Sequence, residues 1–444
     1  MSKDFFGTDG VRGTVGKDPM TVDFAIRLAS AVAQVLAPNG GTVLIGKDTR
    51  LSGYMFESAL EAGFVAAGVD VLLLGPLPTP GIAQLTKEFD ADLGIVISAS
   101  HNLYDDNGIK IFDRDGSKLS DDVEREIEEY LGKPPITRQS ARLGKAKRID
   151  TARIRYQEFC ASTFPEEFDL QGLKVVFDGA NGAGYKVGPR TLANLGAEVI
   201  PIGCSPNGKN INQGCGSTQP ELLQLTVPAV RADVGVALDG DGDRVVMVDE
   251  NGELVDGDQL LYVLATARKS EGRLQGPVVG TVMSNLGLEH ALGQADIEFR
   301  RASVGDRYVL ETLKETGGII GGETSGHMIV LDTTTTGDGL ICALQVLAVM
   351  KKTGKPLSEL AGGMPRYPQE MVNVRINTRL DPDASPQIRE AVAEVEGELA
   401  EKGRVVLRPS GTEPVIRVMV EGEDRDQVVA LAKRLAAVVA EVAA

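Results

Sequence analysis

A serine at the end of a buried strand is the first candidate for chemistry. The run Leu93–Ile97 is apolar and rich in β-branched residues, and the polar segment Ser98–Asn102 follows it at once. Open α/β sheets bind ligands beside the carboxyl ends of their strands, so we expect Ser100 to lie in a ligand site. No G-x-S-x-G motif surrounds Ser100, which argues against a hydrolase nucleophile. The plain alternative is that Ser100 and Asn102 only cap a turn.

Three aspartates, Asp239, Asp241 and Asp243, alternate with glycines in one short segment. Carboxylates brought this close repel one another unless a hard cation lies between them, and a small set of oxygen ligands suits Mg²⁺. An EF-hand is the alternative, because Glu250 is the twelfth residue counted from Asp239. Arg244 stands where that motif needs glycine, and the flanking segments have the pattern of strands. The segment therefore predicts a magnesium loop.

A third polar segment, Gly321–His327, offers the Glu323 carboxylate and the Ser325 hydroxyl two positions apart between glycines. Paired acceptors and donors of this kind suit the vicinal hydroxyls of a sugar. His327 adds a group for proton transfer or phosphate binding. The alternative is a loop with a solvated histidine.

A fourth segment, R-P-S-G-T-E-P, has the composition of an anion-binding nest. Ser410 and Thr412 supply hydroxyls, backbone N–H groups surround Gly411, and Arg408 and Arg417 supply guanidinium groups. A plain turn has no need of both arginines. Local positive charge of this kind is what an acidic protein requires to bind phosphate.

Two further cations have weaker local signals. Arg12 lies in the glycine-punctuated segment Phe6–Gly13 and could grip a phosphate, although an Asp-Gly hairpin turn explains that segment equally well. Lys110 follows the Asn107–Gly108 dipeptide, which predicts a hairpin turn that folds Lys110 back toward Ser100. A surface lysine is the alternative.

The elements that must position these segments form a repeated pattern of strands and helices. Three α/β units follow one another, and each ends a strand in one of the first three polar segments, so we expect these loops to share one central cleft. The fold class predicted is three similar α/β domains with mixed sheets and a smaller α+β C-terminal domain around that cleft. The strands expected are 42–46, 69–74, 93–100, 173–178, 197–202, 234–238, 278–282, 297–301, 318–321, 372–376, 404–407 and 415–420, with C-terminal helices at 386–401 and from 424.

Boundaries between the units follow from linker composition. Gly132–Arg142 is rich in proline and basic residues and poor in apolar ones, as exposed linkers are. Asn251–Gly252 and Gly362–Pro365 mark two later breaks. The domains predicted are 1–149 with the serine loop, 150–250 with the metal loop, 251–365 with the sugar loop and 366–444 with the phosphate loop.

Composition excludes several classes of partner. The 444-residue chain carries a net charge of −17 at pH 7, which disfavours nucleic acid and anionic membranes but leaves room for a small anionic ligand. The four cysteines show no C-x-x-C spacing, so we expect reduced thiols in a cytoplasmic protein. No apolar segment is long enough to span a bilayer. A small-molecule partner is expected, and a homodimer is compatible with the sequence.

Taken in order, the four segments resemble the α-D-phosphohexomutases over essentially the whole chain. The resemblance implies a sugar-phosphate isomerase in which Ser100 is a phosphoserine and a hexose 1,6-bisphosphate is the intermediate and activator. It implies that Asp239, Asp241 and Asp243, together with the Ser100 phosphate, hold Mg²⁺. It also implies that the C-terminal domain closes over the sugar.

The resemblance assigns the remaining residues to substrate. Sugar contacts are implied for Glu323, Ser325 and His327, and the phosphate that is not reacting is bound by Arg408, Ser410, Gly411, Thr412 and Arg417. Arg12, His101, Lys110 and Arg244 would line the transfer site, with Lys110 as the proton shuttle. Leu103 replaces the usual proline, and Thr324 replaces the glutamine usual in glucosamine-type members, which bears on the sugar preferred. A neighbouring glucose or mannose subfamily, a phosphatase and a non-catalytic calcium-binding protein are the alternatives.

Overall fold

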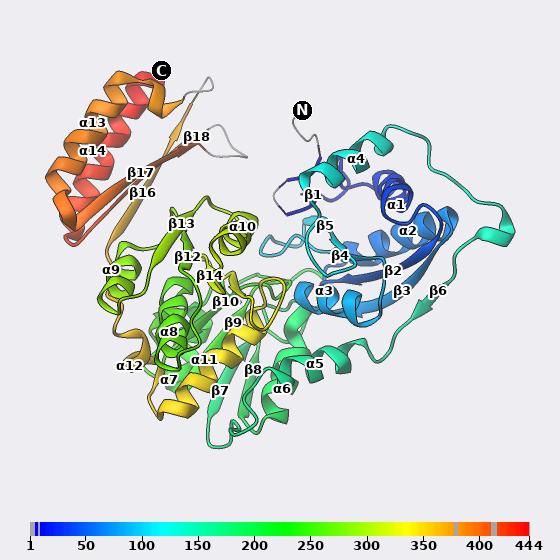
Figure 1. Cartoon of the computed structure of the whole chain (residues 1–444), viewed down its shortest axis with the longest axis horizontal. Coiled ribbons are helices and arrows are strands. Elements are labelled where there is room, and N and C mark those ends of the chain that lie inside the picture. Colours follow the sequence, from blue (N-terminus) through cyan, green and yellow to red (C-terminus); the bar gives the residue numbers. More distant parts are fainter. Residues whose placement is uncertain (1–4, 8, 377–380, 410–414, 444) are drawn as a thin grey trace.

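Three α/β units and a smaller C-terminal unit are present in the computed structural model, as predicted (Figure 1). The structure describes residues 5–7, 9–376, 381–409 and 415–443. Each α/β unit packs helices on a mixed sheet, and the C-terminal unit is an antiparallel sheet with helices on one side. None of the described helices is long and apolar enough to cross a membrane.

The first unit is built on a six-stranded sheet in the order β1-β5-β4-β2-β3-β6. Strands β2, β3, β4 and β6 are parallel, whereas β5 is antiparallel to both of its neighbours. The elements are β1 (Val11–Thr14), α1 (Val22–Leu36), β2 (Gly41–Lys47), α2 (Ser52–Ala67), β3 (Val69–Pro76), α3 (Thr79–Glu88), β4 (Leu93–Ile97), β5 (Asp106–Asp113), α4 (Asp121–Leu131) and β6 (Ala146–Arg148).

The turn predicted at Asn107–Gly108 is wrong, because both residues lie inside β5. Ile97 pairs with Ile109, so the chain reverses earlier, in the segment that contains Ser100. Gly108 is needed for close packing, since a Cβ there would lie 2.5 Å from the Ser98 carbonyl oxygen. Lys110 nevertheless arrives opposite the end of β4.

The second unit has a five-stranded sheet in the order β11-β10-β9-β7-β8. The aspartate segment is the turn between antiparallel strands β9 and β10, so its flanks are strands as predicted and not the helices of an EF-hand. The elements are α5 (Ala152–Ser162), β7 (Lys174–Asp178), α6 (Val187–Asn194), β8 (Glu198–Ile202), α7 (Glu221–Ala229), β9 (Val234–Leu238), β10 (Val245–Val248) and β11 (Leu254–Val255).

The third unit has a four-stranded sheet in the order β13-β12-β14-β15. Strands β14 and β15 are antiparallel and carry the segment from Glu323 to His327 at their turn. The elements are α8 (Gly257–Ser270), β12 (Val278–Thr281), α9 (Leu286–Gln294), β13 (Phe299–Ala302), α10 (Asp306–Thr316), β14 (Ile320–Gly322), β15 (Met328–Val330), α11 (Gly339–Thr353) and α12 (Leu357–Ala361).

The C-terminal unit has its own apolar core. Its sheet order is β16-β18-β17, and α13 and α14 lie together on one side of that sheet (Figure 1). Among the described residues, the buried cluster around Ile416 and Leu431 is separate from the cores of the other units. The elements are β16 (Gln369–Arg375), α13 (Pro386–Leu399), β17 (Gly403–Pro409), β18 (Val415–Gly422) and α14 (Arg425–Ala443).

Candidate active site

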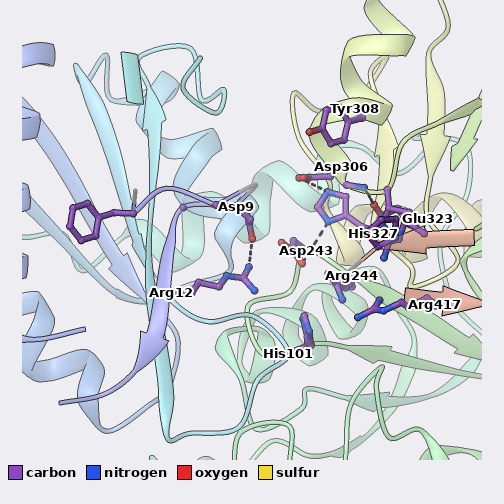
Figure 2. A pocket seen from close by; sticks show the side chains of 17 residues that line it. Asp9, Arg12, His101, Asp243, Arg244, Asp306, Tyr308, Glu323, His327 and Arg417 are labelled. Carbon is purple, nitrogen blue, oxygen red and sulfur yellow. Dashed lines mark hydrogen bonds and ion pairs between the residues drawn. The ribbon is translucent and has the colours of Figure 1, made fainter. Parts of the chain in front are cut away.

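A cavity of about 780 Å³ lies where the four units meet (Figure 2). Each unit contributes polar side chains to its walls, so the single central cleft predicted from the sequence is present. Residues on its walls include Asp9, Arg12, His101, Asp243, Arg244, Asp306, Tyr308, Glu323, His327, Arg408 and Arg417.

Ser100 lies just beyond β4 in the left-handed backbone region, with φ at 51°. Its side chain is buried, and its hydroxyl donates to Oδ2 of Asp239 at 2.6 Å. The His101 Nδ1 atom lies 3.4 Å from the same hydroxyl oxygen. Burial and the charges of Arg244 and Arg12 lower the pKa of His101 to about 4, so its imidazole is neutral at pH 7.

A fully buried arginine that the sequence analysis missed holds this loop in place. Arg50 Nη2 donates to the carbonyl oxygens of Ser100 at 3.0 Å and Asn102 at 2.8 Å, and Asn212 Nδ2 donates to the same two oxygens. Arg50 Nε in turn donates to Asp48 at 2.7 Å. Asp48 and Arg50 come just after the buried strand β2. Polar residues just after a buried strand are the same signal that identified Ser100.

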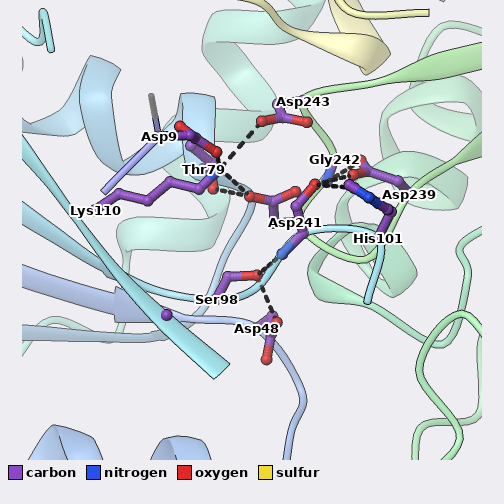
Figure 3. Close-up of polar contacts among 12 residues, drawn as sticks. Asp9, Asp48, Thr79, Ser98, His101, Lys110, Asp239, Asp241, Gly242 and Asp243 are labelled. Atoms are coloured by element: carbon purple, nitrogen blue, oxygen red, sulfur yellow. Dashed lines mark hydrogen bonds and ion pairs between the residues drawn. The ribbon is translucent and has the colours of Figure 1, made fainter. Parts of the chain in front are cut away.

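The backbone of Ser100 is also fixed through Asp48. Ser98 Oγ donates to Asp48 Oδ2 at 2.6 Å and accepts from the Ser100 N–H at 2.9 Å (Figure 3). Burial raises the pKa of Asp48, while the Arg50 charge opposes that rise. The serine therefore stands on a buried hydrogen-bonded support and not on a loose turn.

The three aspartates after β9 meet at one point. Asp239, Asp241 and Asp243 are all buried, and each offers an oxygen within 4.8 Å of the others. Burial and the charges of the other two aspartates raise the pKa of Asp239. The Oδ1 atoms of Asp241 and Asp243 are buried without a hydrogen-bond partner among the described residues. This all-oxygen donor set with unused acceptors fits a hard divalent cation such as Mg²⁺.

Lys110 reaches the same carboxylates from β5. Its Nζ lies 2.8 Å from Asp241 Oδ2, 3.2 Å from Asp243 Oδ2 and 2.8 Å from Asp9 Oδ2 (Figure 3). Burial favours the neutral amine, but these three carboxylates prevail and raise the pKa of Lys110 well above its ordinary value. Thr79, at the start of α3, donates to Asp241 at 2.6 Å. Lys110 is therefore protonated and positively charged at neutral pH.

A second set of charges joins the first and third units. The sequence analysis singled out His327 in this set but missed Asp9, Lys118 and Asp306. Lys118 Nζ lies 2.6 Å from Asp9 and 2.5 Å from Asp306. His327 lies between Asp306, at 3.3 Å, and Asp243, at 3.8 Å (Figure 2). Burial favours neutral imidazole, but Asp306 and Asp243 raise the pKa of His327 to about 9. Such pairs of residues distant in the sequence leave no local pattern.

The hairpin between β14 and β15 presents Glu323 to the cleft. Glu323 Oε1 accepts from the Gly305 N–H at 2.8 Å, and Ser325 Oγ donates to Glu323 Oε2 at 3.2 Å. Ser325 is exposed. Thr324 is turned the other way, since its hydroxyl donates to the buried carboxylate of Asp258 at 2.7 Å. The glutamate and serine predicted to bind sugar are thus together at one hairpin tip.

Arg408 and Arg417 face each other across β17 and β18 and line the cleft. Burial and the charge of Arg417 lower the pKa of Arg408. Arg12 pairs with Asp9 on the opposite wall. Burial alone would lower the pKa of Arg244, but the charges of the nearby aspartates and Glu323 outweigh it and raise that pKa. The other three predicted phosphate ligands, Ser410, Gly411 and Thr412, lie outside the described residues.

Four family models match consecutive parts of the chain. They are described as phosphoglucomutase/phosphomannomutase alpha/beta/alpha domain I at residues 3–135, domain II at 155–252, domain III at 256–367 and the C-terminal domain at 371–438.

Individual proteins are similar over nearly the whole length. A protein of Methylococcus capsulatus named phosphoglucosamine mutase is 57% identical over 442 residues, which cover 99% of each chain. A phosphoglucomutase/phosphomannomutase family protein of Burkholderia thailandensis has the same fold, with a TM-score of 0.81, 24% identity and coverage of 99% of this chain and 98% of that one. The Aspergillus fumigatus N-acetylphosphoglucosamine mutase, solved with GlcNAc-6P and magnesium, has a TM-score of 0.72 at 16% identity and covers 100% of this chain and 96% of that one.

Proposed function

The chain belongs to the phosphoglucomutase/phosphomannomutase family, and we propose that it interconverts glucosamine 6-phosphate and glucosamine 1-phosphate. The observation that carries the sugar assignment is the 57% identity to a phosphoglucosamine mutase over 99% of both chains. The protein is thus an isomerase that acts by phosphoryl transfer, and its product would feed the synthesis of UDP-N-acetylglucosamine and cell-wall precursors. The domain boundaries that we propose remain 1–149, 150–250, 251–365 and 366–444.

Ser100 carries the phosphoryl group in this proposal. The sugar hydroxyl attacks phosphorus in line, the bond from phosphorus to Ser100 Oγ breaks, and a bond to the sugar oxygen forms. Lys110 supports this step because its three carboxylate partners keep it protonated. It can donate a proton to the departing Ser100 oxygen and then take up the proton that the sugar hydroxyl loses. Arg12, His101 and Arg244 surround the transferring group. The product of the step is glucosamine 1,6-bisphosphate.

Asp239, Asp241 and Asp243, with the Ser100 phosphate, would hold Mg²⁺, whose charge would offset the negative charge of the transferring phosphoryl group. The Asp241 Oδ1 atom, which is buried without a hydrogen-bond partner among the described residues, supports this assignment.

The bisphosphate must then turn end for end, so that Ser100 recovers the other phosphate. Glu323 and Ser325 bind ring hydroxyls in both orientations, and His327 completes that wall of the cleft. The distal phosphate is bound by Arg408 and Arg417, together with Ser410, Gly411 and Thr412. Support for this clamp comes from two arginines that face each other at the cleft in a chain of net charge −17.

The cellular site that we propose is the cytoplasm. All four cysteines are free thiols in the described part of the chain, and burial raises the pKa of Cys204 to about 12 and that of Cys215 to about 11. Reduced, unreactive thiols fit a reducing compartment.

The test is a ³¹P NMR time course with Mg²⁺ and a trace of the matching 1,6-bisphosphate. Glucosamine, glucose and mannose 6-phosphates are offered in separate tubes, with the Ser100→Ala variant as the control. We expect glucosamine 1-phosphate to appear fastest. Faster conversion of glucose or mannose 6-phosphate would move the protein to a neighbouring subfamily, and release of inorganic phosphate alone would overturn the isomerase assignment.

A further inference from the structure

The C-terminal unit is attached to the third unit by buried polar contacts at one loop. Residues 281–286, which we call the junction loop, connect β12 to α9. Arg404 Nη2 donates to the Ser284 carbonyl oxygen at 2.5 Å, and the Leu286 N–H donates to Glu421 at 2.9 Å. Glu421 is fully buried and accepts from Arg404 at 2.6 Å. The strands that carry the phosphate clamp are thereby fixed to the junction loop.

The carboxylate of Asp258 also binds the junction loop. This residue lies in the first turn of α8 and is fully buried. Its Oδ2 atom accepts from the Asn285 N–H at 2.8 Å and from the Thr324 hydroxyl at 2.7 Å. One carboxylate oxygen therefore joins the junction loop to the hairpin that carries Glu323 and Ser325.

Asn285 extends the connection to the start of the C-terminal unit. Its Nδ2 donates to the Tyr367 carbonyl oxygen at 3.0 Å, and its Oδ1 accepts from the Tyr367 N–H at 3.0 Å. Tyr367 precedes β16, the first strand of that unit. A continuous series of hydrogen bonds thus runs from Thr324 through Asp258 and Asn285 to the chain entering the C-terminal unit.

We propose that Thr324 and Asp258 are positioning residues that set the distance between the sugar-binding hairpin and the phosphate clamp. The proposal rests on the function proposed above, because a sugar phosphate must contact Glu323 and the two clamp arginines together. Neither Thr324 nor Asp258 touches the cleft in this arrangement; they act through Glu323 and through the junction loop. Small displacements of these contacts lower the reaction rate steeply, because both ends of the substrate must be held in the reactive geometry.

The cost of burying Asp258 supports a role beyond packing. Burial and the nearby charge of Asp256 raise the pKa of Asp258 to about 7, although hydrogen bonds from Asn285 and Thr324 oppose the rise. Asp256 is itself paired with Arg366 at 3.1 Å. An apolar residue would avoid this desolvation cost but would release both the hairpin and the junction loop.

The test compares Thr324→Val, which removes the hydroxyl and keeps the shape, with Thr324→Ser, which keeps the donor. We expect Thr324→Val to lower kcat/KM for glucosamine 6-phosphate about tenfold, as loss of one half-buried hydrogen bond to a carboxylate predicts, and Thr324→Ser to restore it within about twofold. Amide hydrogen exchange of residues 281–286 in the ligand-free protein should quicken in the valine variant only. Asp258→Leu, which removes the shared acceptor, should change both quantities in the same direction.

Thr316→Val is the matched control, because the Thr316 hydroxyl donates only to the Thr312 carbonyl oxygen at the exposed end of α10. It should leave kcat/KM and the exchange of residues 281–286 unchanged. If the amides of residues 281–286 exchange at the wild-type rate in Thr324→Val, the proposed positioning role is wrong, whatever the activity. Failure of the wild-type protein to convert glucosamine 6-phosphate would instead overturn the function proposed. The exchange measurement would still show whether Thr324 holds the junction loop in place.

Discussion

The Ser100 hydroxyl and the Asp239 carboxylate, 139 positions apart in the sequence, meet in a buried hydrogen bond of 2.6 Å. The bond brings the loop after β4 against the turn after β9, so the two most polar strand ends of the first two units form one site. A serine with this neighbour is already adjacent to the group that would bind the metal. Several consequences can be measured.

Replacing Ser100 with Ala should abolish isomerase turnover, with a loss of at least about 10³-fold, because the acceptor oxygen is gone. The melting temperature should fall only slightly, because alanine loses the hydrogen bond to Asp239 but the Ser100 carbonyl contacts with Arg50 and Asn212 do not involve the side chain. A ³¹P assay and a thermal scan check both points. Substantial turnover in this variant would refute the assignment of Ser100.

Asp241→Asn should weaken Mg²⁺ binding by more than about tenfold and raise the Mg²⁺ concentration needed for activity, because replacing a residue that only supports a metal ligand already costs about 10- to 100-fold. Isothermal titration calorimetry with Mg²⁺ measures the affinity directly. Glu250→Gln is the informative comparison, because Glu250 would be a ligand only in an EF-hand. Unchanged affinity in Asp241→Asn, or lost affinity in Glu250→Gln, would contradict the aspartate site.

Arg50→Met should lower the free energy of unfolding by about 3–5 kcal/mol, because it leaves the buried Asp48 without its cation. The same change should reduce kcat, since the carbonyl oxygens of Ser100 and Asn102 lose the Arg50 donor and keep the one from Asn212. Urea unfolding gives the stability difference. Arg27→Met removes an exposed ion pair with Asp23 and should cost about 0.5 kcal/mol or less. If the two variants lowered the free energy of unfolding equally, Arg50 would not be the support of the Ser100 loop.

Arg417→Ala should raise KM for glucosamine 6-phosphate about 10- to 100-fold, as loss of a charged hydrogen bond to phosphate predicts. Arg425→Ala, at the exposed start of α14, is the control and should leave KM unchanged. Initial rates over a range of substrate concentrations separate KM from kcat. A KM unaffected by loss of Arg417 would remove this residue from the clamp.

Asp338 predicts a pH dependence of stability. Burial raises its pKa to about 6 from 3.8, so the folded state binds this proton more tightly than the unfolded chain does. The contribution of Asp338 to the free energy of unfolding is therefore largest below pH 4 and falls by up to about 3 kcal/mol as pH rises through 6. Asp338→Asn should remove that fall, because an amide does not ionise. Its Oδ1 can still accept from the Ile341 N–H and cap α11, and its Nδ2 can donate to the Tyr156 hydroxyl oxygen.

Urea unfolding of the wild type and of Asp338→Asn between pH 4 and 7 tests the direction of this pH dependence. The stability of Asp338→Asn relative to the wild type should grow as pH rises across that interval. A difference that is flat with pH, or one that shrinks, would show that Asp338 ionises normally in the folded protein.

Much of the fold could be predicted because its signals are local. The apolar run before Ser100 and the strands around Asp241 are continuous in the sequence, and the structure forms β4, β9 and β10 there. The turn at Asn107–Gly108 failed as a prediction because tertiary contacts decided the outcome. Asn107 is buried and donates to Ser52, and Gly108 packs against Ser98.

The supporting part of the site could not be predicted in the same way. Lys118 and Asp306 are 188 positions apart, and no periodicity links them. Asp9 was visible only as half of a turn dipeptide, although its carboxylate pairs with Lys110 and Lys118. Arg50 had a usable signal, because it follows a buried strand as Ser100 does. The functional roles expected for the individual site residues stay predictions until the variants are measured.

Arg408 and Arg417 oppose each other across two neighbouring strands, where like charges destabilise a sheet. Burial and the charge of Arg417 lower the pKa of Arg408, so a phosphate ester bound between the two guanidinium groups would offset a repulsion within the C-terminal unit. Since this unit has its own core, its resistance to heat and to proteases should rise with the supply of sugar phosphate. Metabolite abundance would then influence how long the protein survives as well as how fast it works.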